Sequence, residues 1–210
     1  MTHSGALLSP GDEDDAFKKI KALQQGVDAV SARIIQTKQN PLLAGQSHSS
    51  GVILLKKPNL LRLTLTEPEQ ITTVVDGDYI WIYRPDKREA QQYRLSEDYA
   101  RAQAIKFMAN IISFSMTEIE RRFTVAAYRE VDGYLFEMTP KSGVMARFLT
   151  RVTFFFKDGG PVPVWFEVVG RQGASTVTEF KDVVINPVMD KGAFQFTPAK
   201  GVRITNLKDE

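Results

Sequence analysis

The side chains that most often perform catalysis or bind metals are scarce in this sequence. Among 210 residues there are two histidines, His3 and His48, and no cysteine. His3 lies in a short, unpatterned N-terminal segment and His48 lies in a polar stretch, so neither has the neighbours of a metal ligand or a catalytic base. The sequence also lacks a P-loop and a dinucleotide-binding fingerprint. We therefore expect no catalytic residue, no metal site and no cofactor.

Glu118 and Glu120 are one of several pairs of carboxylates that lie close in the sequence. Both fall in a predicted short helix, where acidic residues usually form a solvated face rather than an acid and base pair. An enzyme would need carboxylates or hydroxyls from distant segments to meet in a cavity, and no feature of the sequence requires this. We therefore expect a binding protein that is not an enzyme.

The composition is that of an ordinary globular protein, with 43% hydrophobic and 25% charged residues. A net charge of +2 without a dense basic patch argues against nucleic acid as a partner. No apolar run reaches the length of a membrane span. Because cysteine is absent, no disulfide framework can form within these residues, but this absence does not select a cellular compartment.

Residues 56–85 carry the strongest structural signal. Leu61, Leu63 and Leu65 alternate with polar residues, and this period of two predicts a strand with one apolar face. Asp76-Gly77 predicts a tight hairpin turn between two further strands. Together these segments predict an antiparallel meander.

Around this meander we expect a mainly β fold of about eleven antiparallel strands. Helices are predicted at 12–26, 96–113 and 115–122, and a last short strand at 193–197. Residues 12–210 are expected to form a single domain. Residues 1–11 lack the pattern of a secretory signal, so we expect them to be disordered or added for expression after removal of a natural leader.

The predicted elements are rich in apolar residues, whereas residues suited to polar chemistry are scarce. The chain has 13 Phe, 6 Tyr and 2 Trp, and the predicted 96–113 helix carries Ile105, Met108, Ile111 and Ile112 on or near one face. This helix could pack on the sheet as a conventional core. Alternatively, helix and sheet could enclose a dry cavity that suits a lipid. The residue pattern alone favours the plain core.

The stretch 51–85 closely resembles the periplasmic outer-membrane lipoprotein carriers, the LolA-like family. The shared pattern is a basic residue before Pro58-Asn59, an apolar strand, Glu67-Pro68, Asp76-Gly77 and then Ile80-Trp81-Ile82-Tyr83. A looser likeness extends over about residues 15 to 205. It includes an N-terminal amphipathic helix, a mid-chain helical insertion and the closing Phe194-Gln195-Phe196-Thr197-Pro198.

The resemblance implies an unclosed, strongly curved antiparallel sheet, a half-barrel, whose mouth is covered by helices. It also implies that the acyl chains of a lipoprotein sit between the concave face and this helical lid. The predicted lipid-binding residues are Leu61, Leu63, Leu65 and Trp81 on the sheet and Ile105, Met108, Ile111 and Ile112 on the lid. Met108 suits such a wall because its thioether side chain adapts to variable shapes.

Lys57 marks a departure from the family pattern. Well-studied carriers have arginine at this position, directly before the proline, where it tethers the lid by hydrogen bonds to the lid backbone. An ammonium can donate to a carbonyl but lacks the planar fork of arginine. Lys57 is therefore a candidate lid tether or, alternatively, a solvated lysine at the end of a strand.

The function implied by the resemblance is that of a monomeric periplasmic carrier, its signal peptide removed, that acts as a chaperone in protein transport and outer membrane biogenesis. It would take acylated lipoproteins or a related lipid from an inner-membrane release complex to an outer-membrane acceptor. Two alternatives share the fold. A lipid-sensing regulatory module would usually have a further C-terminal domain. A membrane-anchored lipoprotein acceptor would have a lipidated cysteine near its start, and this sequence contains no cysteine.

Overall fold

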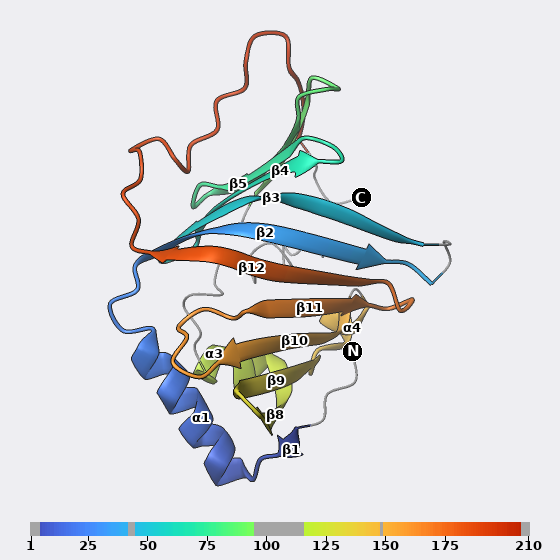
Figure 1. The fold of residues 1–210 in the computed structure, drawn as a ribbon. Coiled ribbons are helices and arrows are strands. Elements are labelled where there is room, and N and C mark those ends of the chain that lie inside the picture. Colours follow the sequence, from blue (N-terminus) through green and yellow to red (C-terminus); the bar gives the residue numbers. More distant parts are fainter. Residues whose placement is uncertain (1–4, 42–44, 95–115, 148, 207–210) are drawn as a thin grey trace. The chain divides into compact units, whose positions relative to one another are not determined.

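The protein is represented by a computed structural model, drawn as a ribbon in Figure 1, which describes residues 5–41, 45–94, 116–147 and 149–206. The chain divides into two compact units. Unit 1 comprises Met1–Gly26, Gln36–Ser47 and Phe114–Phe180. Unit 2 comprises Val27–Ile35, His48–Ser113 and Lys181–Glu210.

Thirteen strands dominate the described residues. They are β1 (Ala6–Leu7), β2 (Ala29–Gln39), β3 (Gln46–Lys56), β4 (Leu60–Glu67), β5 (Ile71–Val75), β6 (Tyr79–Arg84), β7 (Glu89–Arg94), β8 (Phe123–Glu130), β9 (Gly133–Pro140), β10 (Leu149–Lys157), β11 (Trp165–Gly170), β12 (Ser175–Ile185) and β13 (Arg203–Asn206). The helices in the described part of the chain are α1 (Pro10–Leu23), α3 (Met116–Arg122) and α4 (Gly143–Ala146).

The strands follow the linear order β1-β8-β9-β10-β11-β12-β2-β3-β4-β5-β6-β7-β13. β2, β3 and β12 each contribute residues to both units. The mainly β fold with an open antiparallel sheet, predicted from the sequence, is confirmed. The strand count is thirteen, where about eleven were expected. One pair differs from the prediction, because β13 runs parallel to β7.

The predicted meander is confirmed in unit 2, where β4 pairs antiparallel with β5 and β5 pairs antiparallel with β6. Its hairpin turn is built by Asp76, whose carboxylate accepts from the backbone N–H groups of Asp78 at 3.0 Å and Tyr79 at 2.8 Å. Gly77 supplies the positive φ of 108° that this turn needs and that residues with a side chain rarely adopt. The turn chemistry therefore fixes which residues of β5 and β6 face each other.

In unit 1, α1 begins as its sequence dictates. The hydroxyl of Ser9 caps the helix by accepting from the backbone N–H of Asp12, and Pro10 occupies the first turn, where its missing N–H costs nothing. Phe17 and Ile20 are buried along one stripe of the helix. The ring of Phe17 lies 4.4 Å from the ring of Phe136 on β9, so α1 packs on this face of the sheet.

Three local predictions differ from the structure. Residues 5–11 belong to the segment 1–11 that was expected to be disordered or added for expression. They hold β1 and the start of α1, and Leu8 donates a backbone hydrogen bond to Ala127 on β8. The polar stretch 40–50 around His48, whose composition predicts a loop, belongs in part to β3, which starts at Gln46. The strand expected at 193–197 is absent from this described stretch, which is held instead through backbone carbonyls that bond Arg62.

Candidate functional site

The strand register brings the three predicted leucines of β4 together with apolar residues from three neighbouring strands of unit 2. Leu61 pairs with Leu55 of β3 and with Val75 of β5. Val75 in turn lies opposite Ile80 of β6. Residues directly opposite each other in an antiparallel pair point to the same side of the sheet. Ile71, opposite Leu65, lies on this side at its half-buried edge. The buried part of the shared side, called here the leucine face, comprises Ile53, Leu55, Leu61, Leu63, Leu65, Val75, Ile80 and Ile82.

The leucine face is almost wholly apolar and shielded from water. None of its members is more than 7% exposed. Its one polar interruption is Thr73, which lies between Leu63 and Ile82 and is also buried. Burying one such aliphatic side chain contributes about 1.5–3 kcal/mol relative to leaving it exposed. The face therefore makes apolar contacts, and it has almost no polar chemistry to offer.

Trp81 lies on the opposite side of the same strands. It alternates with Ile80 and Ile82 along β6, so its indole points away from the leucine face. Its ring centroid is 5.3 Å from that of Phe196, and its indole N–H donates to the Asp76 carboxylate at 3.0 Å. The structure thus does not bring Trp81 together with the three leucines, and its predicted lipid-binding role is separate from theirs.

The remaining predicted residues are placed less fully. Lys57 follows the end of β3 and is half-buried, and its backbone N–H donates to the carbonyl of Asp28 at 2.9 Å. This contact holds the Lys57 backbone beside the start of β2. It does not involve the side-chain ammonium, whose role as a lid tether stays a prediction. The four predicted lid residues lie outside the described residues; they are Ile105, Met108, Ile111 and Ile112.

A second apolar surface lies in unit 1, and the sequence predictions did not single it out as a site. Six buried rings follow one another at centroid distances of 4.4, 6.0, 6.3, 5.7 and 5.9 Å. This phenylalanine row comprises, in spatial order, Phe17, Phe136, Phe156, Phe154, Phe166 and Phe180. The alternation of phenylalanines in β10 was visible in the sequence. The partners on α1, β9, β11 and β12 were not, because they come from distant segments.

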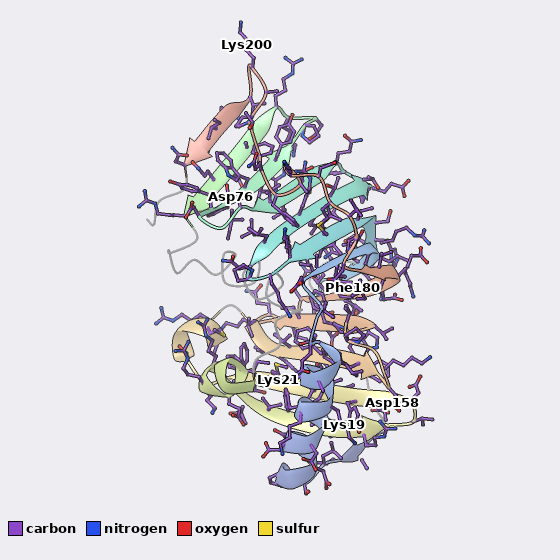
Figure 2. All side chains as sticks on the ribbon, turned by 90° about the vertical axis from the view of Figure 1, so that its left-hand side faces the viewer. Lys19, Lys21, Asp76, Asp158, Phe180 and Lys200 are labelled. Carbon is purple, nitrogen blue, oxygen red and sulfur yellow. The ribbon has the colours of Figure 1, made fainter. Side chains whose placement is uncertain are left out.

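Charged groups gather at the end of unit 1 where α1 meets the β8–β9 hairpin. Arg129 makes two short hydrogen bonds to Asp158, of 2.7 and 2.6 Å, and its guanidinium lies 4.7 Å from the ring centroid of Tyr134. Lys19 of α1 donates to the Tyr134 hydroxyl at 3.1 Å, and Figure 2 labels Lys19 and Asp158. The pKa of Asp158 is lowered by its hydrogen bonds to Arg129, and that of Lys19 is raised by its bond to Tyr134. These contacts tie α1 to the hairpin.

Metal ligands do not converge anywhere in the part of the chain that the structure describes, where no group of three His, Asp or Glu side chains is placed to hold an ion. Within the same residues, no helix has both the length and the apolar character that crossing a membrane requires.

The open antiparallel sheet, with its buried apolar faces, places the described residues in the mainly β class. The family model described as "Outer membrane lipoprotein carrier protein LolA" matches residues 25–197. Because this match covers most of the chain, the protein belongs to the LolA family of lipoprotein carriers.

Individual relatives agree with this assignment. The chain is 28% identical over 190 residues to an outer-membrane lipoprotein carrier protein of Neisseria meningitidis serogroup B, covering 90% of this chain and 86% of the relative. It is 22% identical over 200 residues to a protein of the same name from Pseudomonas aeruginosa, covering 95% and 92%. Among solved structures, an uncharacterized conserved protein from Thermus thermophilus superposes with a TM-score of 0.54 at 10% identity, covering 93% and 99%. At that identity the superposition shows a shared fold alone.

Proposed function

We propose that this chain binds the acyl chains of lipoproteins, or of a related lipid, on the leucine face of unit 2. The observation that carries the proposal is the register of β3–β6, which gathers aliphatic side chains on one almost wholly apolar face. Family membership supports it, since the relatives matched are called outer-membrane lipoprotein carrier proteins. The face is buried in the structure, so binding requires its cover to move aside.

The energetics of such a surface suit a carrier. Each buried methylene contributes about 0.8 kcal/mol, so one long acyl chain could contribute roughly 10 kcal/mol. Opening the cover breaks the protein's own hydrophobic contacts and offsets part of this gain. The remaining affinity is low enough for the cargo to be handed on. An acyl ligand shifts the equilibrium between the closed and the open cover only by its difference in affinity for these two states, so we propose that a partner protein drives loading.

The cover and its tether complete the proposal. On the family resemblance, we propose that Ile105, Met108, Ile111 and Ile112 contact the acyl chain from the lid side and that the Lys57 ammonium holds the lid closed. We further propose that the protein works as a monomer in the periplasm after removal of a signal peptide. There it would receive cargo from an inner-membrane release complex and deliver it to an outer-membrane acceptor.

Native mass spectrometry of the full chain, after expression in cells whose membranes contain lipoproteins, tests the proposal. We expect species heavier than the bare chain by the mass of acylated cargo, released by organic extraction. A chain that stays empty after repeated incubation with lipoproteins and with free lipids would overturn the carrier function. Recovery of a free lipid alone would favour a lipid-sensing module of the same fold.

A further inference from the structure

The phenylalanine row of unit 1 ends at a buried polar pair. The side-chain amide of Gln36 on β2 donates to the hydroxyl of Thr178 on β12 at 3.1 Å. Gln36 is 6% exposed and Thr178 is fully buried. Thr178 lies directly opposite Phe166 of β11, and Phe166 lies opposite Phe154 of β10. The pair therefore shares the face on which the phenylalanine row lies, and Figure 2 labels the last ring of that row, Phe180.

Gln36 occupies a position that the pattern of β2 reserves for apolar residues. Ala32 and Ile34, at the two preceding positions of the same alternation, are 2% and 1% exposed. A leucine or methionine at position 36 would continue the stripe without burying any polar atom. A carboxamide at this position loses its hydration and needs hydrogen-bond partners in return.

The Thr178 hydroxyl satisfies only part of the carboxamide. A glutamine side chain has two N–H donors and a carbonyl oxygen that can accept two hydrogen bonds. Among the described residues, the bond to Thr178 is the one that the Gln36 side chain makes. One donor and the carbonyl acceptor are therefore available on this face. The other buried glutamine, Gln24, differs because it donates to the carbonyl of Pro161 at 2.9 Å and so ties the end of α1 to a loop.

We propose that the Gln36–Thr178 pair binds a secondary amide that joins an acyl chain to its headgroup, with the chain lying along the phenylalanine row. A secondary amide offers one N–H and one carbonyl, which complement the free acceptor and donor of the Gln36 carboxamide. An ester offers acceptors only and would leave the Gln36 carbonyl unpaired. Because an unpaired buried polar atom costs more than a hydrogen bond contributes, the site discriminates amide from ester. This inference rests on the proposed function, because it presumes that the apolar faces open to acyl ligands.

Two probes that differ in a single atom test the inference on the full chain. N-palmitoylglycine carries the amide, and O-palmitoyl glycolic acid carries an ester oxygen where the amide has N–H. Titration calorimetry should give a dissociation constant roughly tenfold lower for the amide probe, the range expected for one hydrogen bond and one avoided unpaired acceptor. Gln36→Met keeps the volume of the side chain and should make the two affinities equal. The control Gln39→Met alters an exposed glutamine of the same strand and should keep the preference.

The outcomes separate this inference from the function on which it rests. A wild-type chain that binds neither probe overturns both proposals. Equal binding of both probes, or an amide preference that survives Gln36→Met, overturns the amide site and leaves the carrier intact. If Gln36→Met fails to fold, the side-chain NH2 resonances of Gln36 in the wild type decide. They should shift with the amide probe more than with the ester probe, and an equal response to both contradicts the inference.

Discussion

Leu63 and Thr64 are neighbours in β4 whose side chains lie on opposite faces of the same strand. Leu63 belongs to the leucine face and is 7% exposed, whereas Thr64 is half-buried on the other side. We predict that Leu63→Glu weakens acyl binding at least tenfold, about 1.4 kcal/mol, because a carboxylate would have to be desolvated against the chain. Binding of a fluorescent fatty acid measures this, with circular dichroism as the test of folding.

The matched control for Leu63→Glu is Thr64→Glu, which adds the same charge one residue away and should leave binding within about twofold, because it leaves the leucine face unchanged. We predict the same loss of binding for Ile111→Glu on the proposed lid. If Leu63→Glu and Ile111→Glu chains are both simply unfolded, these positions belong to a closed core, and the binding surface has been misplaced.

Asp76 is the residue that organises the meander, because its carboxylate accepts from two backbone N–H groups and from the indole of Trp81. Asp76→Ala removes all three acceptor contacts and should lower the free energy of unfolding by about 1–3 kcal/mol. Asp78→Ala, an exposed carboxylate in the same turn, should change it by less than about 0.5 kcal/mol. Urea unfolding of the two variants measures the difference, and equal effects would show that the turn does not depend on the Asp76 carboxylate.

Single residues differ in how far the sequence determines their place. Alternation predicts that Leu63 and Thr64 lie on opposite faces of their strand. The prediction grouped Trp81 with the leucines, and only the register of β4, β5 and β6 shows that its side chain lies on the opposite face. The contact between Gln36 and Thr178 could not be predicted, because 142 residues separate them and only the pairing of β2 with β12 brings them together. Lys57 lies just after the end of a strand, as the sequence indicated. The role of its ammonium stays a prediction.

At the scale of elements, α1 is held on the sheet mainly by its buried stripe. Phe17→Ala removes a ring in contact with Phe136 and should lower the free energy of unfolding by about 3–5 kcal/mol. Lys18→Ala, next to it on the exposed side, removes only a surface ion pair with Asp15 and should cost less than about 0.5 kcal/mol. Thermal and urea unfolding of both variants test this, and a small effect of Phe17→Ala would mean that α1 is not part of the core.

The ion pair between Arg129 and Asp158 gives the β8–β9 hairpin a pH dependence with a defined sign. Arg129 holds the pKa of Asp158 below its ordinary value of 3.8. The unfolded chain therefore binds this proton at a higher pH than the folded chain. The stabilisation is fully present above the ordinary pKa and is lost as the pH falls through the lower folded-state value.

Asp158→Asn should accordingly destabilise the protein slightly at pH 6, and the difference from wild type should shrink as the pH falls below 3.8. The effect is small because both partners are substantially exposed, and added salt should reduce it further. Urea unfolding at several pH values provides the measurement. A difference that is constant with pH would contradict the assigned role of the pair.

Elements were predictable where local pattern and turn chemistry agree, as in β4, β5 and β6. The stretch 193–197 shows how pattern can mislead. Phe194 and Phe196 alternate as in a strand, but Arg62 donates to the carbonyls of Ala193 and Gln195, and the Phe196 ring packs on Trp81. The last strand, β13, lies further along the chain beside β7. Its four residues are all exposed, so their pairing leaves no hydrophobic signature.

At the scale of the whole molecule, strand order is the feature that local sequence patterns determine least. Neighbouring strands such as β12 and β2, or β1 and β8, are separated in sequence by more than half of the chain. Such pairings depend on tertiary packing rather than on local propensity. Family resemblance predicted the class of fold because it carries tertiary information that composition and periodicity lack. The matched stretch, residues 25–197, includes both the leucine face and most of the phenylalanine row.

The most direct measurement of the central claim is to map where a bound acyl chain lies. A fatty acid with a diazirine near its terminal methyl group is bound to the full chain, irradiated and located by peptide mass spectrometry. We predict labels on residues of the leucine face in β3, β4 and β6, such as Ile53, Leu63 and Ile82. Labels confined to the opposite face, on Trp81 or Phe196, or no labels above an unirradiated control, would contradict the claim that this face receives the cargo.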